Sequence, residues 1–154
     1  MGLAKRNVHL MCSIALCVAV IGQSVHAQEA SVLEKELAPA GLHLELNRLE
    51  QNGAACRATL IVRNGFEAGL DETGFELVMF EKAGLISLMT VFDFGMLPAG
   101  KTMVRRFDLP QTECNGLTRI LVNGVSRCAG EGIVVARCQT NFTTANRAEI
   151  EFGR

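Results

Sequence analysis

Short segments in which apolar and polar residues alternate recur along the chain from Leu42 onward. A period of two is typical of strands that bury one face. Turn signals separate these segments, among them Asn64-Gly65 and Leu97-Pro98-Ala99-Gly100, and no long helical period lies between them. The pattern therefore predicts seven strands, at residues 42–49, 56–62, 75–81, 85–94, 101–109, 117–122 (or 117–125) and 139–152.

Seven short strands favour an all-β fold, namely an antiparallel, immunoglobulin-like sandwich of two sheets, with a small barrel as the alternative. Within the fifth strand, the pair Arg105-Arg106 interrupts the alternation and predicts a β-bulge. Sandwiches of this kind bind through their end loops or by adding a strand at an edge. The candidate interaction loops are residues 64–74, 95–102 and 129–137, with Met96, Lys101, Gly130 and Gly132 as candidate residues.

The N-terminal segment has the three parts of a secretory signal peptide. Lys5 and Arg6 precede an apolar run from Leu10 to Ile21, and Val25-His26-Ala27 offers a site for cleavage after Ala27. Twelve apolar residues cover about 18 Å, less than the roughly 30 Å of a bilayer core, so we expect no membrane anchor after cleavage. The sequence thus predicts a signal peptide at 1–27, a polar lead-in at 28–41 and a single β-sandwich domain at 42–154.

Composition narrows the class of partner. Removal of Lys5 and Arg6 leaves 13 basic residues against 16 acidic ones, a net charge of about −3, which speaks against nucleic-acid binding. With 49% hydrophobic and 20% charged residues, the chain is not disordered. Because Lys5-Arg6 contains one arginine, the general secretion route is favoured over the twin-arginine route. We expect a periplasmic or secreted protein whose partner is a periplasmic protein or another cell-envelope component.

Four cysteines follow the predicted cleavage site, and an even set in an exported chain indicates two disulfides. If residues 117–125 form a strand, they span about 26 Å, which disfavours Cys114–Cys128 because bonded Cα atoms lie within about 7 Å. Cys128 and Cys138 flank a glycine-containing segment, so a bond there closes a loop and leaves Cys56 for Cys114. An immunoglobulin-like topology would place the latter pair at one end. A four-thiolate zinc site is disfavoured because no C-x2-C pair exists.

One stretch matches a phosphate-binding motif. Residues 95–102 fit the pattern G-x-x-x-x-G-K-T, in which backbone N–H groups at the start of a helix hold phosphates. Here the residues after Thr102 predict a strand, and Pro98 removes one N–H group. Export also separates the chain from nucleotide pools. We therefore interpret the stretch as a turn between two strands.

Residue types that serve catalysis are scarce after Ala27. His43 is the histidine that remains, and we expect it on the solvent side of its strand. None of Ser31, Ser87 and Ser126 lies in a G-x-S-x-G setting. We therefore predict neither an enzyme nor a cofactor or metal site.

Methionines provide the alternative function, a carrier of a small ligand or of copper. Thioether sulfur is a soft ligand that selects Cu(I). Met79, Met89 and Met103 lie inside predicted strands, where we expect them to fill the core, whereas Met96 lies in a turn and is expected to be exposed.

Several stretches of residues 42–138 are similar to sequences of a known protein family. They are Leu44-Glu45-Leu46-Asn47-Arg48-Leu49, Ala55-Cys56-Arg57, Leu77-Val78-Met79-Phe80, Leu97-Pro98-Ala99-Gly100-Lys101-Thr102 and Leu121-Val122-Asn123-Gly124-Val125. In these the chain resembles a family of small, functionally uncharacterised exported proteins of alphaproteobacteria, often named by their signal sequence. It is more loosely similar to bacterial immunoglobulin-like modules. The resemblance implies an exported compartment and a β fold, and it brings no catalytic residues.

Overall fold

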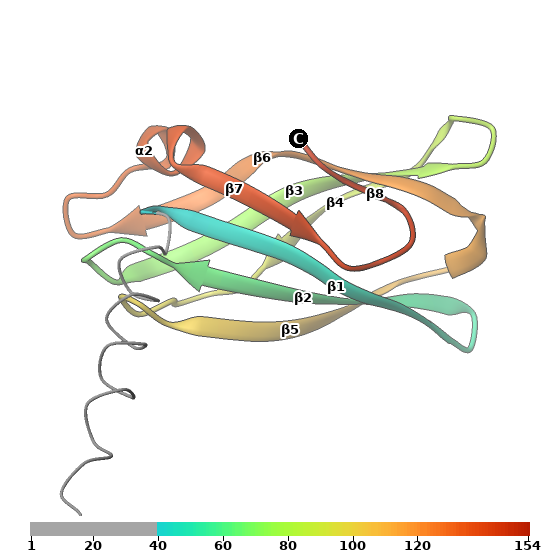
Figure 1. Ribbon diagram of the computed structural model, residues 1–154, viewed down its shortest axis with the longest axis horizontal. Coiled ribbons are helices and arrows are strands. Elements are labelled where there is room, and N and C mark those ends of the chain that lie inside the picture. The colour runs from blue at the N-terminus through green and yellow to red at the C-terminus, as the bar shows by residue number, and fades with distance from the viewer. Residues whose placement is uncertain (1–39) are drawn as a thin grey trace, which may run out of the picture. The chain divides into compact units, whose positions relative to one another are not determined.

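The computed structural model describes residues 40–154, which form two four-stranded sheets. The signal peptide predicted at 1–27 and nearly all of the lead-in predicted at 28–41 lie outside the described residues. Residues 40–154 form eight strands and a short helix, α2, which are labelled in Figure 1. The strands are β1 (Leu42–Asn52), β2 (Ala55–Asn64), β3 (Leu70–Glu81), β4 (Ile86–Asp93), β5 (Thr102–Leu109), β6 (Leu117–Gly130), β7 (Phe142–Asn146) and β8 (Glu151–Gly153).

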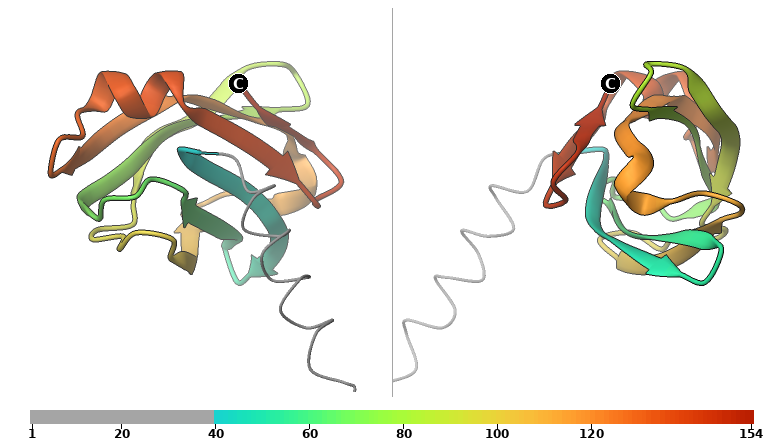
Figure 2. Two further views of the ribbon diagram at one scale, coloured as in Figure 1. Left: turned by 60° about the vertical axis from the view of Figure 1, so that its left-hand side comes forward. Right: turned by 90° about the vertical axis from the view of Figure 1, so that its right-hand side faces the viewer.

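The two sheets pack face to face, which confirms the all-β sandwich. One sheet has the order β5-β2-β1-β7 and the other the order β4-β3-β6-β8. Their separation is visible in the right-hand view of Figure 2. Strands β7 and β8 run parallel to β1 and β6, respectively, while the other pairings are antiparallel. The C-terminal segment therefore crosses from one sheet to the other.

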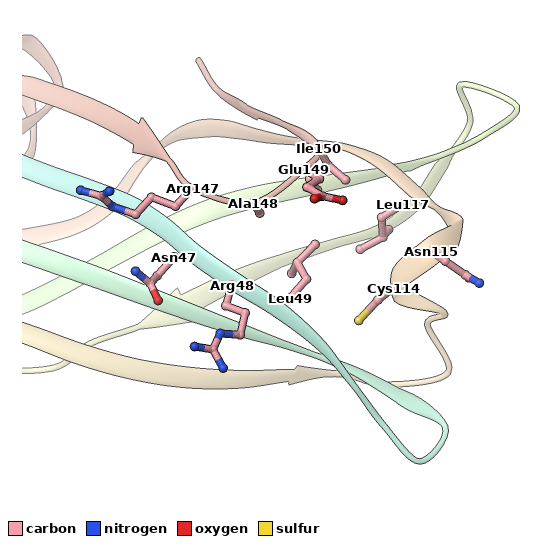
Figure 3. Close-up of a pocket in the computed structure, with 10 residues that line it drawn as sticks. All are labelled: Asn47, Arg48, Leu49, Cys114, Asn115, Leu117, Arg147, Ala148, Glu149 and Ile150. Atoms are coloured by element: carbon pink, nitrogen blue, oxygen red, sulfur yellow. The ribbon is translucent and has the colours of Figure 1, made fainter.

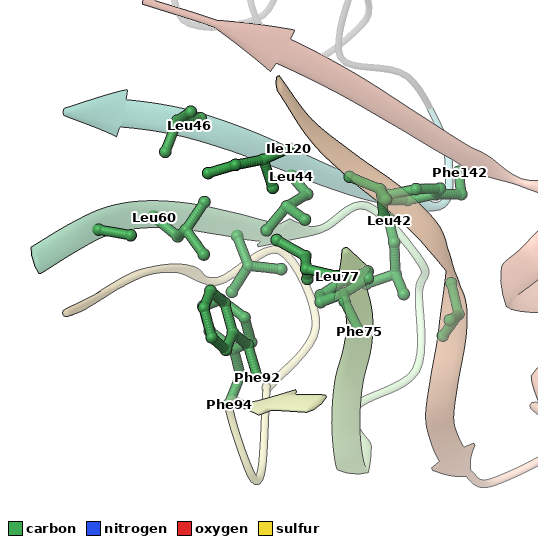
Figure 4. Packing of buried hydrophobic residues seen from close by; sticks show 14 of the residues in the cluster. Leu42, Leu44, Leu46, Leu60, Phe75, Leu77, Phe92, Phe94, Ile120 and Phe142 are labelled. Atoms are coloured by element: carbon green, nitrogen blue, oxygen red, sulfur yellow. The ribbon is translucent and has the colours of Figure 1, made fainter. Parts of the chain in front are cut away.

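Alternate residues of the central strands fill the space between the sheets. In β1 and β2 the burial alternates as the sequence predicts, with Leu42, Leu44 and Leu46 inside. A register shift at Asn47 then moves Leu49 toward the core as well. Phe75 lies at the centre of an aromatic group, 5.6 Å from the Phe94 ring and 5.2 Å from the Phe142 ring between centroids (Figure 4).

The C-terminal quarter differs from the prediction. The single strand expected at residues 139–152 is instead the end of α2 (Val135–Thr140), then β7, a turn and β8, so the strands number eight rather than seven. The Asn146 side chain closes the turn, since its Nδ2 donates to the Ile150 carbonyl (2.6 Å) and its Oδ1 accepts from the Ala148 N–H (2.9 Å). Elements this short leave little periodic signal in a sequence.

Two smaller predictions also need correction. The loop predicted at 64–74 is shorter, because β2 ends at Asn64 and β3 begins at Leu70. The bulge predicted at Arg105-Arg106 is wrong, since β5 pairs with β2 in unbroken register from Thr102 to Leu109. Arg105 has the parity of the core-facing residues of β5. Because β5 lies at a sheet edge, the Arg105 side chain extends to the rim of the sandwich instead of the core, and its Nη2 donates to the Phe94 carbonyl (3.3 Å).

Both predicted disulfides are present. Cys56–Cys114 has a Cα–Cα distance of 5.0 Å and joins β2 to the 3-10 turn Cys114–Gly116, which leads into β6 of the other sheet. Cys128–Cys138 has a Cα–Cα distance of 6.4 Å and joins the end of β6 to α2. The first bond thus links the two sheets, and the second fixes the helix on its sheet.

Candidate functional site

The three predicted interaction loops meet at one end of the sandwich, the end at which α2 lies in Figure 1. Asn64 ties two of them together although it is fully buried. Its Nδ2 donates to the carbonyls of Ala68 (2.9 Å) and Leu97 (3.0 Å), and its Oδ1 accepts from the Phe66 N–H (2.9 Å). These hydrogen bonds fix the loops that follow β2 and β4 to each other and to the core.

The four candidate loop residues have different surroundings. Met96 is exposed, and Lys101 closes a turn in which its N–H donates to the Pro98 carbonyl (3.1 Å) before β5 begins. Residues 95–102 thus form a turn leading into a strand, as predicted. Gly130 ends β6 so close to its neighbours that a Cβ there would lie 2.3 Å from the Gly69 carbonyl oxygen. Gly132 has a φ of +66° and open space around its Cα. The segment 129–137, predicted as a loop, includes the first turn of α2.

An open cleft of about 480 Å³ lies at the opposite end (Figure 3). Leu49, Leu117 and Ile150 provide apolar lining, and Arg48 and Arg147 provide charge. Each arginine already has an acidic partner: Arg48 Nη1 lies 3.2 Å from Glu50 Oε1, and Arg147 Nε lies 3.1 Å from Glu45 Oε1. A second cleft of about 420 Å³ shares Leu117 with the first and is lined by Glu81, Ser87 and residues 110–113. Neither cleft brings a nucleophile beside a histidine, because His43 lines neither of them.

The outer face of the sheet β5-β2-β1-β7 carries polar side chains. Arg57 and Asp108 form a bidentate pair across β2 and β5, with Nε–Oδ1 and Nη2–Oδ2 distances of 2.7 and 2.9 Å. This hydrogen bonding lowers the pKa of the Asp108 carboxyl and raises the pKa of Arg57. His43 Nδ1 lies 3.0 Å from Thr143 Oγ1 on the neighbouring strand β7. Polar groups thus pair with one another on this face, and Val104 is its exposed large hydrophobic residue among residues 40–154.

The outer face of the other sheet is different, because apolar side chains gather along β4. Among residues 40–154, five of the seven exposed large hydrophobic residues lie between positions 85 and 96, and Met89 has 53% of its surface exposed. The prediction that Met89 fills the core is therefore wrong, whereas Met79 is buried as predicted. We call this group the β4 patch; it consists of Leu85, Ile86, Met89, Val91 and Met96.

Pairing with β3 shows how the patch is built. Ile86, Met89 and Val91 lie opposite Phe80, Val78 and Glu76, on the face that points away from the core. Val78 is only 2% exposed, yet it does not belong to the core cluster, so other side chains of the outer face cover it. Leu121 of β6 lies opposite Val78 on its other side. The apolar surface therefore continues from β4 across β3 to β6, on the outer face of this sheet.

The backbone of β4 has one free edge, because no strand among residues 40–154 pairs with it on the side away from β3. The Phe94 N–H donates to the Thr73 carbonyl (2.8 Å), and the register is unbroken from Gly74–Asp93 to Met79–Leu88. Since hydrogen-bonded and non-hydrogen-bonded pairs alternate in antiparallel sheets, Phe92 and Thr90 direct their backbone groups toward β3. The N–H and C=O groups of Val91 and Met89 accordingly point to the free edge.

The sequence prediction missed this surface, although a signal for it exists. Residues 85–94 are apolar at positions of both parities, including Leu85, Ile86, Leu88, Met89 and Val91. A sandwich strand with one face in solvent should alternate. Apolar residues of both parities therefore indicate that the outer face of this strand also carries apolar side chains.

Comparison with known proteins adds no relative: no family model, no curated protein and no solved structure matches the chain. Within residues 40–154, no group of three or more His, Cys, Asp or Glu side chains is placed to hold a metal ion. The helices of this part of the chain are also too short or too polar to cross a membrane.

Proposed function

We propose that this protein is an exported, non-catalytic binding module that takes up an added strand along β4. The partner strand is an extended segment of another cell-envelope protein, with apolar side chains at alternate positions. Such a segment would pair with the outward N–H and C=O groups of Met89 and Val91, while its apolar side chains would cover the β4 patch.

The observation that carries the proposal is the difference between two edge strands, β5 of one sheet and β4 of the other. Natural sheets protect an exposed edge with charged residues or bulges. Edge strand β5 follows this rule over most of its length, since it carries Arg105, Arg106 and Asp108 beside a single exposed apolar residue, Val104. Edge strand β4 has a register shift at Ser87 and a charge at Asp93, but between these two positions it presents Met89 and Val91. An edge left this apolar is explained by a strand that covers it.

The compartment and the finer fold class belong to the same proposal. Two disulfides are consistent with an oxidising, exported location. The orders β1-β2-β5 and β4-β3-β6 support an immunoglobulin-like arrangement. A periplasmic location of the mature chain follows from the predicted cleavage after Ala27.

Site-specific photocrosslinking in the periplasm tests the proposal. A photoreactive residue at Ile86, which is exposed at the start of β4, should give an adduct of one discrete mass with a second polypeptide. The variant Val91→Pro should abolish the adduct, because proline removes an N–H group that points to the free edge and is not used by β3. Val104→Lys on β5, which changes an exposed valine of the other sheet's edge strand, is the control and should leave the adduct unchanged.

Two results would contradict strand addition. An adduct that persists in Val91→Pro would show that the partner does not use the β4 backbone. The absence of any adduct from position 86, with the folded protein abundant in the periplasm, would show that the patch has no partner there. Melting curves of both variants establish that each is folded.

The copper-carrier alternative has weaker support. Met79 is fully buried, so it offers no accessible thioether. Met89 and Met96 are exposed, but they also belong to the apolar patch, which accounts for both without a metal.

A further inference from the structure

We infer that, when no partner strand is bound, the β4 edge pairs with the β4 edge of a second copy of this chain, in a two-fold dimer whose axis passes through Thr90. This inference rests on the proposed function, because it uses the same edge. A self-paired resting state would protect an apolar edge that is otherwise exposed to unwanted pairing. The partner would then have to displace the second copy.

The direction of backbone and side chains limits the possible registers. In an antiparallel pair, residues that lie opposite each other point to the same face. Met89, Val91 and Asp93 point outward, and Leu88, Thr90 and Phe92 point inward. A two-fold axis between two residues would place outward side chains opposite inward ones. The axis must therefore pass through a residue.

Side-chain chemistry selects one residue among the three near the middle of the strand. An axis at Thr90 places Met89 opposite Val91 twice, so that apolar side chains meet at both positions. An axis at Val91 would place the Asp93 carboxylate opposite Met89, and an axis at Met89 would place it beyond the register shift at Ser87, outside the regular ladder of β4. Asp93 already pairs with Arg127 at the end of the patch. The axis at Thr90 leaves this ion pair at the rim and places Ser87 opposite Asp93.

The two-fold axis makes the interface self-complementary, since the same residues, Met89 and Val91, contribute from both copies. Leu85 and Met96 lie outside β4, so they flank the paired ladder and are not part of it.

The register shift at the start of β4 sets the length of the pairing. The regular ladder with β3 breaks between Met79 and Phe80, where Ser87 is the extra residue. The regular free edge is thus about six residues long. Such an interface is smaller than the roughly 800 Å² per partner of a stable complex, so we expect a dimer that dissociates on dilution.

Sedimentation velocity on the purified mature protein, with its disulfides intact, tests the dimer. We expect the average mass to rise from that of a monomer toward that of a dimer between about 1 and 500 μM, the range of a weak complex. Val91→Pro and Met89→Lys should remain monomeric throughout this range. The second variant changes an exposed side chain and so keeps the test valid if proline disturbs the strand. Val104→Lys should dimerise as the unaltered protein does.

Cysteine crosslinking tests the register. Under mild oxidation, Thr90→Cys should form a disulfide between two copies, because its Cβ would lie opposite itself in a non-hydrogen-bonded pair. Met89→Cys should form it at least tenfold more slowly, since Met89 would lie opposite Val91. Peptide mapping must show Cys56–Cys114 and Cys128–Cys138 intact in both variants.

The outcomes separate this inference from the proposed function. A protein that stays monomeric up to 500 μM, or a dimer that persists in both Val91→Pro and Met89→Lys, would overturn the self-pairing. A monomer that still gives an Ile86 adduct with a different polypeptide would overturn the dimer and leave the proposed function standing. A dimer that gives adducts with its own kind alone would support the dimer and contradict the proposed partner.

Discussion

The two disulfides close loops of very different length, which predicts unequal contributions to stability. Cys56 and Cys114 are 58 residues apart, and Cys128 and Cys138 are 10 residues apart. A crosslink lowers the entropy of the unfolded chain by an amount that grows with the logarithm of the loop length. At 25 °C the chain-entropy relation gives about 4.2 kcal/mol for the long loop and about 2.7 kcal/mol for the short one. Their difference of about 1.5 kcal/mol is roughly tenfold in the unfolding equilibrium.

Urea unfolding of two double variants, Cys56→Ala/Cys114→Ala and Cys128→Ala/Cys138→Ala, measures this difference. Replacing both members of a pair leaves no unpaired thiol to exchange with the other disulfide. Each variant removes sulfur from buried positions, since Cys56, Cys128 and Cys138 are all buried, so the cavity costs are similar. The first variant should lose the larger free energy of unfolding. If the second variant lost as much or more, loop entropy would not be the main source of stabilisation, and the fixation of α2 on β6 would be.

Three further predictions concern single residues, each measured by urea unfolding. Asn64→Ala should cost about 2–3 kcal/mol, because it leaves the Ala68 carbonyl and the Phe66 N–H without their hydrogen-bond partner and removes one of the two donors to the Leu97 carbonyl; an unchanged stability would contradict the role given to Asn64. Asp108 has a pKa below its usual 3.8, chiefly through the hydrogen bond from Arg57, so its stabilising effect is present above the unfolded-state pKa and is lost as the pH falls through the lower folded-state pKa. The stability difference between the unaltered protein and Asp108→Asn should therefore shrink from pH 6 to pH 2, and a constant difference would refute this. Gly130→Ala should cost about 1–3 kcal/mol because its Cβ meets the Gly69 carbonyl, and should exceed the cost of Gly132→Ala, which meets open space and bears only the cost of a left-handed backbone.

The alternation of residue types predicted the central strands well, because β1, β2 and β3 each have one face toward the core. In such strands a shift by one residue would exchange buried and exposed side chains, so the register is strongly determined. The disulfide pairing could be predicted for a related reason. The length of β6 separates Cys114 from Cys128 and leaves each of them to a partner at its own end.

The short helix, the course of β5 and the exposed face of β4 depend on tertiary contacts that the sequence pattern does not show. The six residues of α2 are shorter than two turns, and the helix is held by Cys138 rather than by its own periodicity. The Arg105-Arg106 pair interrupts the alternation without a bulge, because an edge strand lets Arg105 reach the Phe94 carbonyl at the rim. The sequence prediction missed the exposure of Met89, because an apolar residue in a strand is usually buried. Only its pairing with Val78 shows that Met89 lies on the outer face of the sheet.

The proposed addition of a strand is favoured by the position of the β4 patch between two fixed ends. Cys56–Cys114 holds the sheets together at one end, and Asn64 with Cys128–Cys138 holds the loops and α2 at the other. The β4 strand lies between these ends and is itself paired with β3 along its length (Figure 1). Its backbone is therefore already extended before a partner arrives, and an incoming strand does not have to order it. Because ordering costs reduce affinity, an edge fixed in this way can bind a short segment whose contact area is small.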